Sequence, residues 1–241
     1  MIKFFRKIRQ NLLMENKTGK YLKYAIGEII LVVIGILIAL SINNWNENIK
    51  NQKFEQKVLN EILLDTKEDI SETTNSLVGI QDSEHSNSII LNALNSKLAY
   101  NDSLNVHFAK ALRFWSLSPN STAFEAIKTE GLYHIKNDSI RQLVSKLNTY
   151  LFDYIKVLES RQQDYNMNII QPRIIAQFDY YNSESMTPNN YGTLKTDLEY
   201  QGILKTLSSM RKRYAEMLNV RLNWLTRLNE QIEEELDVNY K

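Results

Sequence analysis

Hydrophobic residues follow two patterns along this chain. They form one continuous run within about the first 45 residues, and they alternate with polar residues in the rest. Residues 24–45 read YAIGEIILVVIGILIALSINNW, and Glu28 is the only charged side chain in this run. Farther along, apolar residues recur every three or four positions between charged ones, which is the period of amphipathic helices. The pattern predicts one continuous apolar helix followed by helices that pack on one another.

The apolar run is long enough to cross a membrane. Ala25–Ile42 comprises 18 residues, which at 1.5 Å per residue is about 27 Å, close to the hydrocarbon thickness of about 30 Å. No polar stripe interrupts Ile29–Leu40, although a helix on the surface of a soluble domain normally has one. Tyr21, Tyr24 and Trp45 flank the run, where amphipathic aromatic rings favour the headgroup level. We therefore expect a transmembrane helix over 25–42, with these three residues as interface anchors.

A cleaved signal peptide is the alternative interpretation of the run. Ala39-Leu40-Ser41 has the small–x–small pattern of a cleavage site, and basic residues precede it. However, the leading segment is long, and the run exceeds the usual apolar length of about 7–15 residues. We favour an uncleaved signal anchor.

Charge sets the expected orientation. Residues 1–42 carry seven Lys or Arg and two acidic residues, so residues 43–241 carry the remaining 22 basic and 26 acidic ones. The positive-inside rule places the N-terminus in the cytoplasm and 43–241 in the periplasm of a bacterial inner-membrane protein. A mildly acidic folded part argues against nucleic acid as a partner.

Glu28 has two interpretations, which the sequence leaves open. It lies about one turn inside the expected cytoplasmic interface, where it can snorkel toward Lys20, Lys23 or water. Alternatively it faces a protein partner, because intramembrane carboxylates usually point into an assembly. Small residues nearby permit close helix approach. The hypothetical helix contact comprises Gly27, Glu28, Leu31, Gly35 and Ala39.

The first residues predict a second membrane element. In MIKFFRKIRQNLLME, apolar residues fall near helical spacing, and Lys3, Arg6, Lys7 and Arg9 cover the other side. This is typical of a short helix on an anionic leaflet, with a basic tail that has no regular structure as the alternative. We expect a cytoplasmic basic amphipathic segment (1–24), a transmembrane helix (25–42) and a periplasmic helical bundle (43–241).

Residues 43–241 are expected to be all-α. The chain has only 7 Gly and 3 Pro among 241 residues, and these are the residues that interrupt helices. No Gly or Pro follows Trp45 directly, so the first helix is expected to continue to about Leu77. Val144, Leu151, Leu158 and Tyr165, seven apart, predict a coiled-coil-like seam. The expected later elements are short helices at 87–98 and 103–115, a capping box at Thr122 and Glu125 with Gly131 as its stop, a long helix capped by Asp138 that Pro172 ends or kinks, a loop at 182–192, and a long helix from about Asp197 to Leu236.

The search for chemistry returns no catalytic, cofactor-binding or metal-binding motif. Cysteine is absent, and the three histidines His85, His107 and His134 fall outside any metal-binding spacing. Glycine-rich phosphate loops and nucleophile elbows are also absent from the sequence. Tyrosines could line a ligand pocket, although they more often pack a bundle with the hydroxyl in water; these are Tyr150, Tyr154, Tyr165, Tyr180 and Tyr181. We expect no enzyme activity and no cofactor.

The N-terminal residues MIKFFRKIRQ and YAIGEIILVVIGILIALSINNWNE closely resemble the start of a large family of uncharacterised single-pass membrane proteins from Bacteroidota. TAFEAIKTEGLYHIKNDSIRQ (122–142) and TDLEYQGILKTL (196–207) are similar to later parts of that family. The resemblance implies an inner-membrane protein with a helical periplasmic part. It implies no activity, cofactor or catalytic residue.

Two functions are compatible with these features. The first is a non-enzymatic, membrane-anchored interaction or scaffold protein that binds lipids and other envelope proteins or itself. The second is a sensor-like periplasmic ligand-binding module, which would signal through a membrane partner because about 24 residues before the span cannot hold a signalling domain. An enzyme is the least favoured class.

Overall fold

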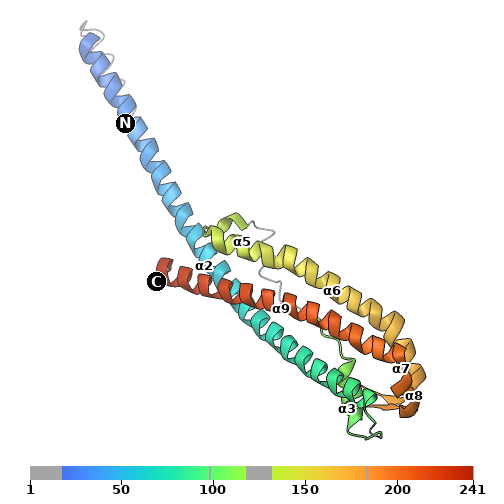
Figure 1. Ribbon diagram of the computed structural model, residues 1–241. Helices are drawn as coiled ribbons and strands as arrows, with labels where there is room; N and C mark the ends of the chain where they lie inside the picture. The colour runs from blue at the N-terminus through green and yellow to red at the C-terminus, as the bar shows by residue number, and fades with distance from the viewer. Residues whose placement is uncertain (1–17, 98, 118–131, 183, 241) are drawn as a thin grey trace. The chain divides into compact units, whose positions relative to one another are not determined.

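The computed structural model describes residues 18–97, 99–117, 132–182 and 184–240 (Figure 1). The basic residues Lys3, Arg6, Lys7 and Arg9 and the expected capping box at Thr122 lie outside the described residues. Within the described part the chain is almost entirely helical, as expected for the all-α class. By packing, the chain divides between Phe54 and Glu55 into two units, which are described separately.

The first unit is the N-terminal part of helix α2 (Thr18–Asn95), a helix of 78 residues. From Leu22 to Ile42 its large apolar side chains are exposed. By length and composition, α2 is the one helix in the described residues that could cross a membrane. Because a helix satisfies all its backbone hydrogen bonds internally, this segment meets the requirement of a hydrocarbon environment.

The second unit begins where α2 starts to bury side chains, at Glu55. The expected continuation of the helix past Trp45 is confirmed, but α2 does not end near Leu77. It runs to Asn95 and includes most of the segment expected as a separate helix at 87–98. Gly79 and the many Ser and Asn residues of this region have poor helix propensity, but burial of one face of α2 outweighs it.

Short elements follow α2. Helix α3 covers Leu104–Ala111, four residues shorter at its C-terminus than the expected 103–115. Residues 112–117 leave α3 without regular structure, and the 3₁₀ helix η1 covers Leu132–His134.

A long helical segment then runs from Asp138 to Gln177. It consists of α5 (Asp138–Lys146), the π-helical turn η2 (Leu147–Leu151), α6 (Phe152–Tyr165), the π-helical turn η3 (Asn166–Ile170) and α7 (Gln171–Gln177). Asn137, not Asp138, is its N-cap, and the Asn137 side chain accepts hydrogen bonds from the N–H groups of Ser139 and Ile140.

Pro172 does not end this segment. The proline ring has no N–H to donate and would clash with the carbonyl four residues earlier in a regular α-helix. The π-helical turn η3 directly before α7 widens the helix at that point, so the segment continues through Pro172 to Gln177. The sequence indicated the perturbation but not how the chain accommodates it.

A small hairpin occupies part of the expected loop at 182–192. Strands β1 (Phe178–Tyr181) and β2 (Met186–Pro188) pair antiparallel, with an irregular register between Phe178 and Tyr180. Helix α8 (Tyr191–Thr196) follows. Helix α9 (Leu198–Asn239) is the third long helix and begins where the sequence places it. Asp197 is its N-cap and accepts from the N–H groups of Glu199 and Tyr200 at 2.9 Å each.

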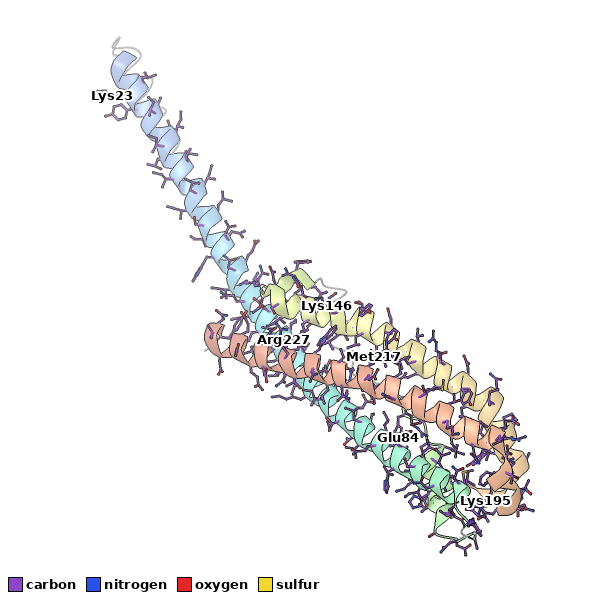
Figure 2. All side chains as sticks on the ribbon, viewed as in Figure 1. Lys23, Glu84, Lys146, Lys195, Met217 and Arg227 are labelled. Atoms are coloured by element: carbon purple, nitrogen blue, oxygen red, sulfur yellow. The ribbon has the colours of Figure 1, made fainter. Side chains whose placement is uncertain are left out.

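In the second unit, α2 from Glu55 onward, the α5–α7 segment and α9 lie side by side (Figure 1). Helix α9 runs antiparallel to both others, because Glu235 near its end meets Asn137, whereas Leu204 near its start meets Asn87. Figure 2 draws the side chains along these helices, including Glu84 on α2 and Met217 on α9.

An apolar cluster lies where α2 ends and α3, the hairpin and α8 join the bundle. Phe108, Phe178 and Tyr200 form its aromatic centre, with the ring centroids of Phe108 and Phe178 5.4 Å apart in an edge-on arrangement. Burial raises the pKa of Tyr200 well above its usual range, with a further contribution from the charge of Asp197.

Of the glycines in α2, Gly79 is the one where an added side chain would meet other atoms. A Cβ atom at Gly79 would lie 2.1 Å from Cζ2 of Trp115. We expect Gly79→Ala to destabilise the bundle by about 1–3 kcal/mol, because overpacking displaces the indole. Gly202→Ala in α9 is the matched control: within the described structure nothing lies within 4 Å of its Cβ, so it should stabilise by about 0.4–1 kcal/mol.

The measurement is chemical denaturation of the full chain in detergent micelles, followed by circular dichroism. If the free energies of unfolding of both alanine variants changed in the same direction, the close packing of Trp115 on α2 would be contradicted.

Candidate functional site

The hypothetical contact residues of the span all lie on α2 in the first unit. Gly27, Leu31, Gly35 and Ala39 are exposed, and Glu28 is partly buried. Among the described residues, nothing lies within 4 Å of a Cβ built at Gly27 or Gly35. Another helix could therefore approach the α2 backbone closely at these glycines.

Helix geometry orders these residues around the α2 axis. At 3.6 residues per turn, Glu28, Gly35 and Ala39 fall within about 40° of one another. Gly27 lies about 80° from Gly35 and so flanks this line instead of sharing it. Asn46, seven residues after Ala39, continues the line beyond the apolar run. Glu28 is thus closer to the small-residue line than Gly27 is.

The expected interface anchors have the exposure that the headgroup region requires. Tyr24 and Trp45 are exposed, the latter at 67%. Tyr21 belongs to α2, and its side chain is outside the described part.

Polar side chains fill much of the buried face of α2 in the second unit. This face carries Thr66, Asp69, Thr73, Ser76, Ser83 and Asn87 at spacings of three, four and seven residues. Thr66, Thr73 and Ser83 donate their hydroxyl protons to the carbonyl four residues earlier. Their burial therefore leaves no hydroxyl donor unpaired.

Two arginines of α9 are buried against this polar face. The Nη2 atom of Arg221 donates to Oδ2 of Asp69 at 2.6 Å, and its Nη1 atom contacts the hydroxyl of Thr73. The side chains of Arg221 and Asp69 are only 6% and 12% exposed. The pair bridges α2 and α9 in the middle of the bundle.

Arg211, 2% exposed, joins three segments. It donates to Oε1 of Glu84 at 3.0 Å and to the carbonyl oxygens of Ala111 and Arg113 at 2.6 and 3.0 Å. Ser208 donates to the other carboxylate oxygen of Glu84. Burial lowers the pKa of Arg211, and the hydrogen bond and charge of Glu84 oppose that shift.

Glu159 on α6 holds the other end of the segment 112–117. Its Oε1 atom accepts from the N–H of Leu117 at 2.8 Å and from the hydroxyl of Tyr214 at 2.7 Å. Its Oε2 atom accepts from Lys156 at 2.9 Å. Burial raises the pKa of Tyr214, and the hydrogen bond to Glu159 raises it further.

A polar cavity of about 420 Å³ lies between this segment and α6. Its lining comprises Phe114, Trp115, Ser116, Lys156, Glu159, Gln162, Gln163 and Asn166. Trp115 is fixed on α2 by its close contact with Gly79 and by a hydrogen bond from its Nε1 to Oγ of Ser83 at 3.3 Å. The cavity therefore has one rigidly held aromatic wall.

Gln162 is the exceptional residue of this lining. Its side chain is 5% exposed, and its Nε2 atom has no hydrogen-bond partner among the residues that the structure describes. A buried amide donor without an acceptor costs about 1–3 kcal/mol. We therefore treat this cavity as the candidate binding site of the bundle.

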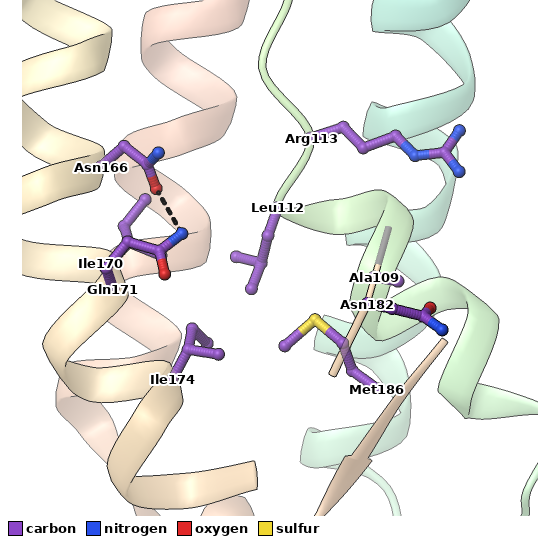
Figure 3. Close-up of a pocket in the computed structure, with 9 residues that line it drawn as sticks. All are labelled: Ala109, Leu112, Arg113, Asn166, Ile170, Gln171, Ile174, Asn182 and Met186. Atoms are coloured by element: carbon purple, nitrogen blue, oxygen red, sulfur yellow. Dashed lines mark hydrogen bonds between the residues drawn. The ribbon is translucent and has the colours of Figure 1, made fainter. Parts of the chain in front are cut away.

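A second cavity, of about 250 Å³, lies between α3, the α7 end of the helical segment and the hairpin (Figure 3). Leu112, Ile170, Ile174 and Met186 give it an apolar lining. The guanidinium of Arg113 points away from the cavity in Figure 3, and Gln171 donates to Oδ1 of Asn166 at 3.4 Å. This cavity presents less hydrogen-bonding chemistry than the first.

None of the five tyrosines considered as pocket residues lines either cavity. Tyr150 is 72% exposed, and the hydroxyl of Tyr154 accepts from Arg213. Tyr165 packs against the apolar cluster, whereas the side chains of Tyr180 and Tyr181 are outside the described part.

The histidines are dispersed. His107 pairs with Oγ of Ser86 at 3.2 Å, and its pKa is lowered by burial and by the charges of Lys110 and His85. His85 is exposed, and the ring of His134 contacts that of Tyr133. No group of three His, Asp or Glu residues suited to a metal ion occurs in the part of the chain that the structure describes.

Comparison with known proteins gives one match. A model for a family of unknown function, DUF6090, matches residues 28–110, from Glu28 in the apolar part of α2 to Lys110 in α3. No curated protein and no solved structure matches this chain. The matched region is therefore similar to an uncharacterised domain, and it includes the polar face of α2.

The Asp69–Arg221 pair provides a test of the polar interior. Asp69→Ala should destabilise the bundle by about 3–5 kcal/mol, because it leaves the Arg221 charge buried without its carboxylate. The double variant Asp69→Leu/Arg221→Met should recover most of that loss, since buried ion pairs can often be replaced by apolar residues of similar size.

Urea denaturation of the full chain in micelles measures these effects. Glu233→Ala is the control, because it breaks the exposed Lys67–Glu233 pair and should change stability by less than about 1 kcal/mol. A double variant as unstable as Asp69→Ala would show that the pair does not act as a unit.

Proposed function

We propose that the protein is a membrane-anchored, non-enzymatic interaction protein of the bacterial cell envelope. In this proposal residues 25–42 span the inner membrane and residues 43–241 form a periplasmic bundle. The observation that carries it is the exposed apolar stretch of α2. This stretch and the first helix of the bundle are parts of one continuous helix. An exposed apolar surface of this extent is expected where lipid or a partner covers it.

The orientation rests on charge. Seven Lys or Arg residues precede the span, whereas one acidic residue, Glu15, precedes it and another, Glu28, lies inside it. Basic residues close to a transmembrane helix are retained on the cytoplasmic side. The bundle, which follows the span, is then exported.

The proposed partner contact in the membrane is the line of Glu28, Gly35 and Ala39, flanked by Gly27 and Leu31. Apolar side chains gain little from leaving lipid for another helix, so association depends on close packing and polar contacts. The glycines permit close packing, and Glu28 supplies a polar contact. Another copy of this chain or a different envelope protein would meet these requirements.

A ligand-binding module remains the second candidate function. The polar cavity beside Trp115 favours it, because an aromatic wall and a buried amide without a partner are features of a ligand site and not of a plain spacer.

The orientation is testable with reporter fusions. An alkaline phosphatase fused after Lys241 should be active, because it reaches the oxidising periplasm, and one fused at Lys20 should be inactive. The reverse pattern would contradict the orientation, and a mature N-terminus near Ile42 would show that the span is a cleaved signal peptide.

The helix contact is testable by disulfide crosslinking, since the chain has no native Cys. Single cysteines at Gly27, Leu31, Gly35 and Ala39 should crosslink or capture a membrane protein, whereas cysteine at Leu37, about 180° from Glu28 around the axis, should not. Gly35→Leu should abolish the contact by bulk. Glu28→Gln should weaken it only modestly, since interhelical polar contacts contribute about 0.6–2 kcal/mol.

Val33→Leu is the control for added bulk, because Val33 lies about 160° from Gly35 around the helix. Equal crosslinking at Leu37 and Gly35, or no effect of Gly35→Leu, would contradict the proposed helix contact. Glu28 would then be a residue that snorkels to the interface.

A further inference from the structure

The cavity beside Trp115 has a construction that packing alone does not explain. Its aromatic wall is held by contacts on α2, and the two charged side chains of its lining, Lys156 and Glu159, neutralise each other as an ion pair. Glu159 accepts from Leu117, Tyr214 and Lys156, so its acceptor capacity is largely occupied. The hydrogen-bonding groups of the lining that remain available to a ligand are therefore mainly neutral side-chain amides.

Gln162 identifies the kind of group that is missing. Its buried Nε2 can only donate, so the complementary group is an acceptor such as a hydroxyl or carbonyl oxygen. Gln163 and Asn166 add further amide groups to the same lining. The volume of about 420 Å³ falls within the range of small-molecule sites, roughly 300–1,000 Å³.

We propose that this cavity, walled by Trp115 and floored by Gln162, binds a neutral saccharide. One face of a sugar ring carries C–H groups, whose partly positive hydrogens suit the negative face of an indole. Its hydroxyl oxygens accept hydrogen bonds from amide N–H groups. The paired charges of Lys156 and Glu159 give the site no net charge to attract an ionic ligand. This inference is independent of the membrane contact proposed above.

The test uses the full chain in lipid nanodiscs and ligand-observed saturation-transfer NMR. The probes are glucose, galactose, N-acetylglucosamine and the β-1,4-linked disaccharides of glucose and N-acetylglucosamine, at millimolar concentration. At least one probe should give a transfer signal that titrates to saturation.

Two variants locate the site. Gln162→Met removes the donor at similar side-chain length and should weaken binding roughly tenfold, the equivalent of one hydrogen bond. It should change the unfolding temperature little, because the Nε2 donor that it removes has no hydrogen-bond partner among the described residues. Trp115→Ala should abolish the signal, and Gln142→Met, at an exposed glutamine of α5, should leave it unchanged.

The proposal is overturned if no probe binds the unmodified chain. It is also overturned if binding persists unchanged in both Gln162→Met and Trp115→Ala, because the sugar would then bind elsewhere. Loss of binding in these two variants with retention in Gln142→Met supports it.

Discussion

Arg211 is the constraint on which the arrangement of the bundle depends. A guanidinium cannot lose its proton in a protein interior, so each buried arginine must be surrounded by acceptors. Arg211 obtains them from Glu84 on α2 and from the carbonyl oxygens of Ala111, the last residue of α3, and Arg113, just after it. One side chain of α9 thereby fixes α2 and the start of the 112–117 segment together. A shift of either would leave a buried charge without its partner, a far larger penalty than a lost apolar contact.

The two interfaces of α9 consequently differ in character. Toward the α5–α7 segment the buried residues are mainly aliphatic, with Ile140, Val144 and Leu151 among them. Toward α2 the interior combines hydroxyl and carboxylate groups with Arg211 and Arg221. Aliphatic packing tolerates small displacements, whereas directional hydrogen bonds specify a single register. We infer that the hydrophobic contacts supply most of the stability and that the arginines supply the alignment of α2 with α9.

The sequence predicted local features well and long-range ones poorly. The apolar run, the all-α class and the start of α9 near Asp197 follow from period and composition, each of which acts within a few residues. In α9 the apolar side chains of Met210 and Met217 are only partly buried, whereas the charged side chains of Arg211 and Arg221 are buried, the reverse of what residue type alone predicts. Their acceptors lie more than 90 residues away. The candidate cavity was missed for the same reason, although Gly79 within a helical pattern was a usable signal of close approach.

The cavity owes its shape to the same turns of α2 that hold Arg211. Glu84 pairs with Arg211, and the preceding residue, Ser83, accepts from Trp115 while donating to the carbonyl of Gly79. Gly79, one turn earlier, admits the indole against the α2 backbone. Because Arg211 also holds Ala111 and Arg113, the chain that carries Trp115 is fixed at its start by the same ion pair. The ionic alignment of α2 with α9 and the position of the aromatic wall are therefore one constraint, so any displacement of α2 along α9 would also move the wall of the cavity.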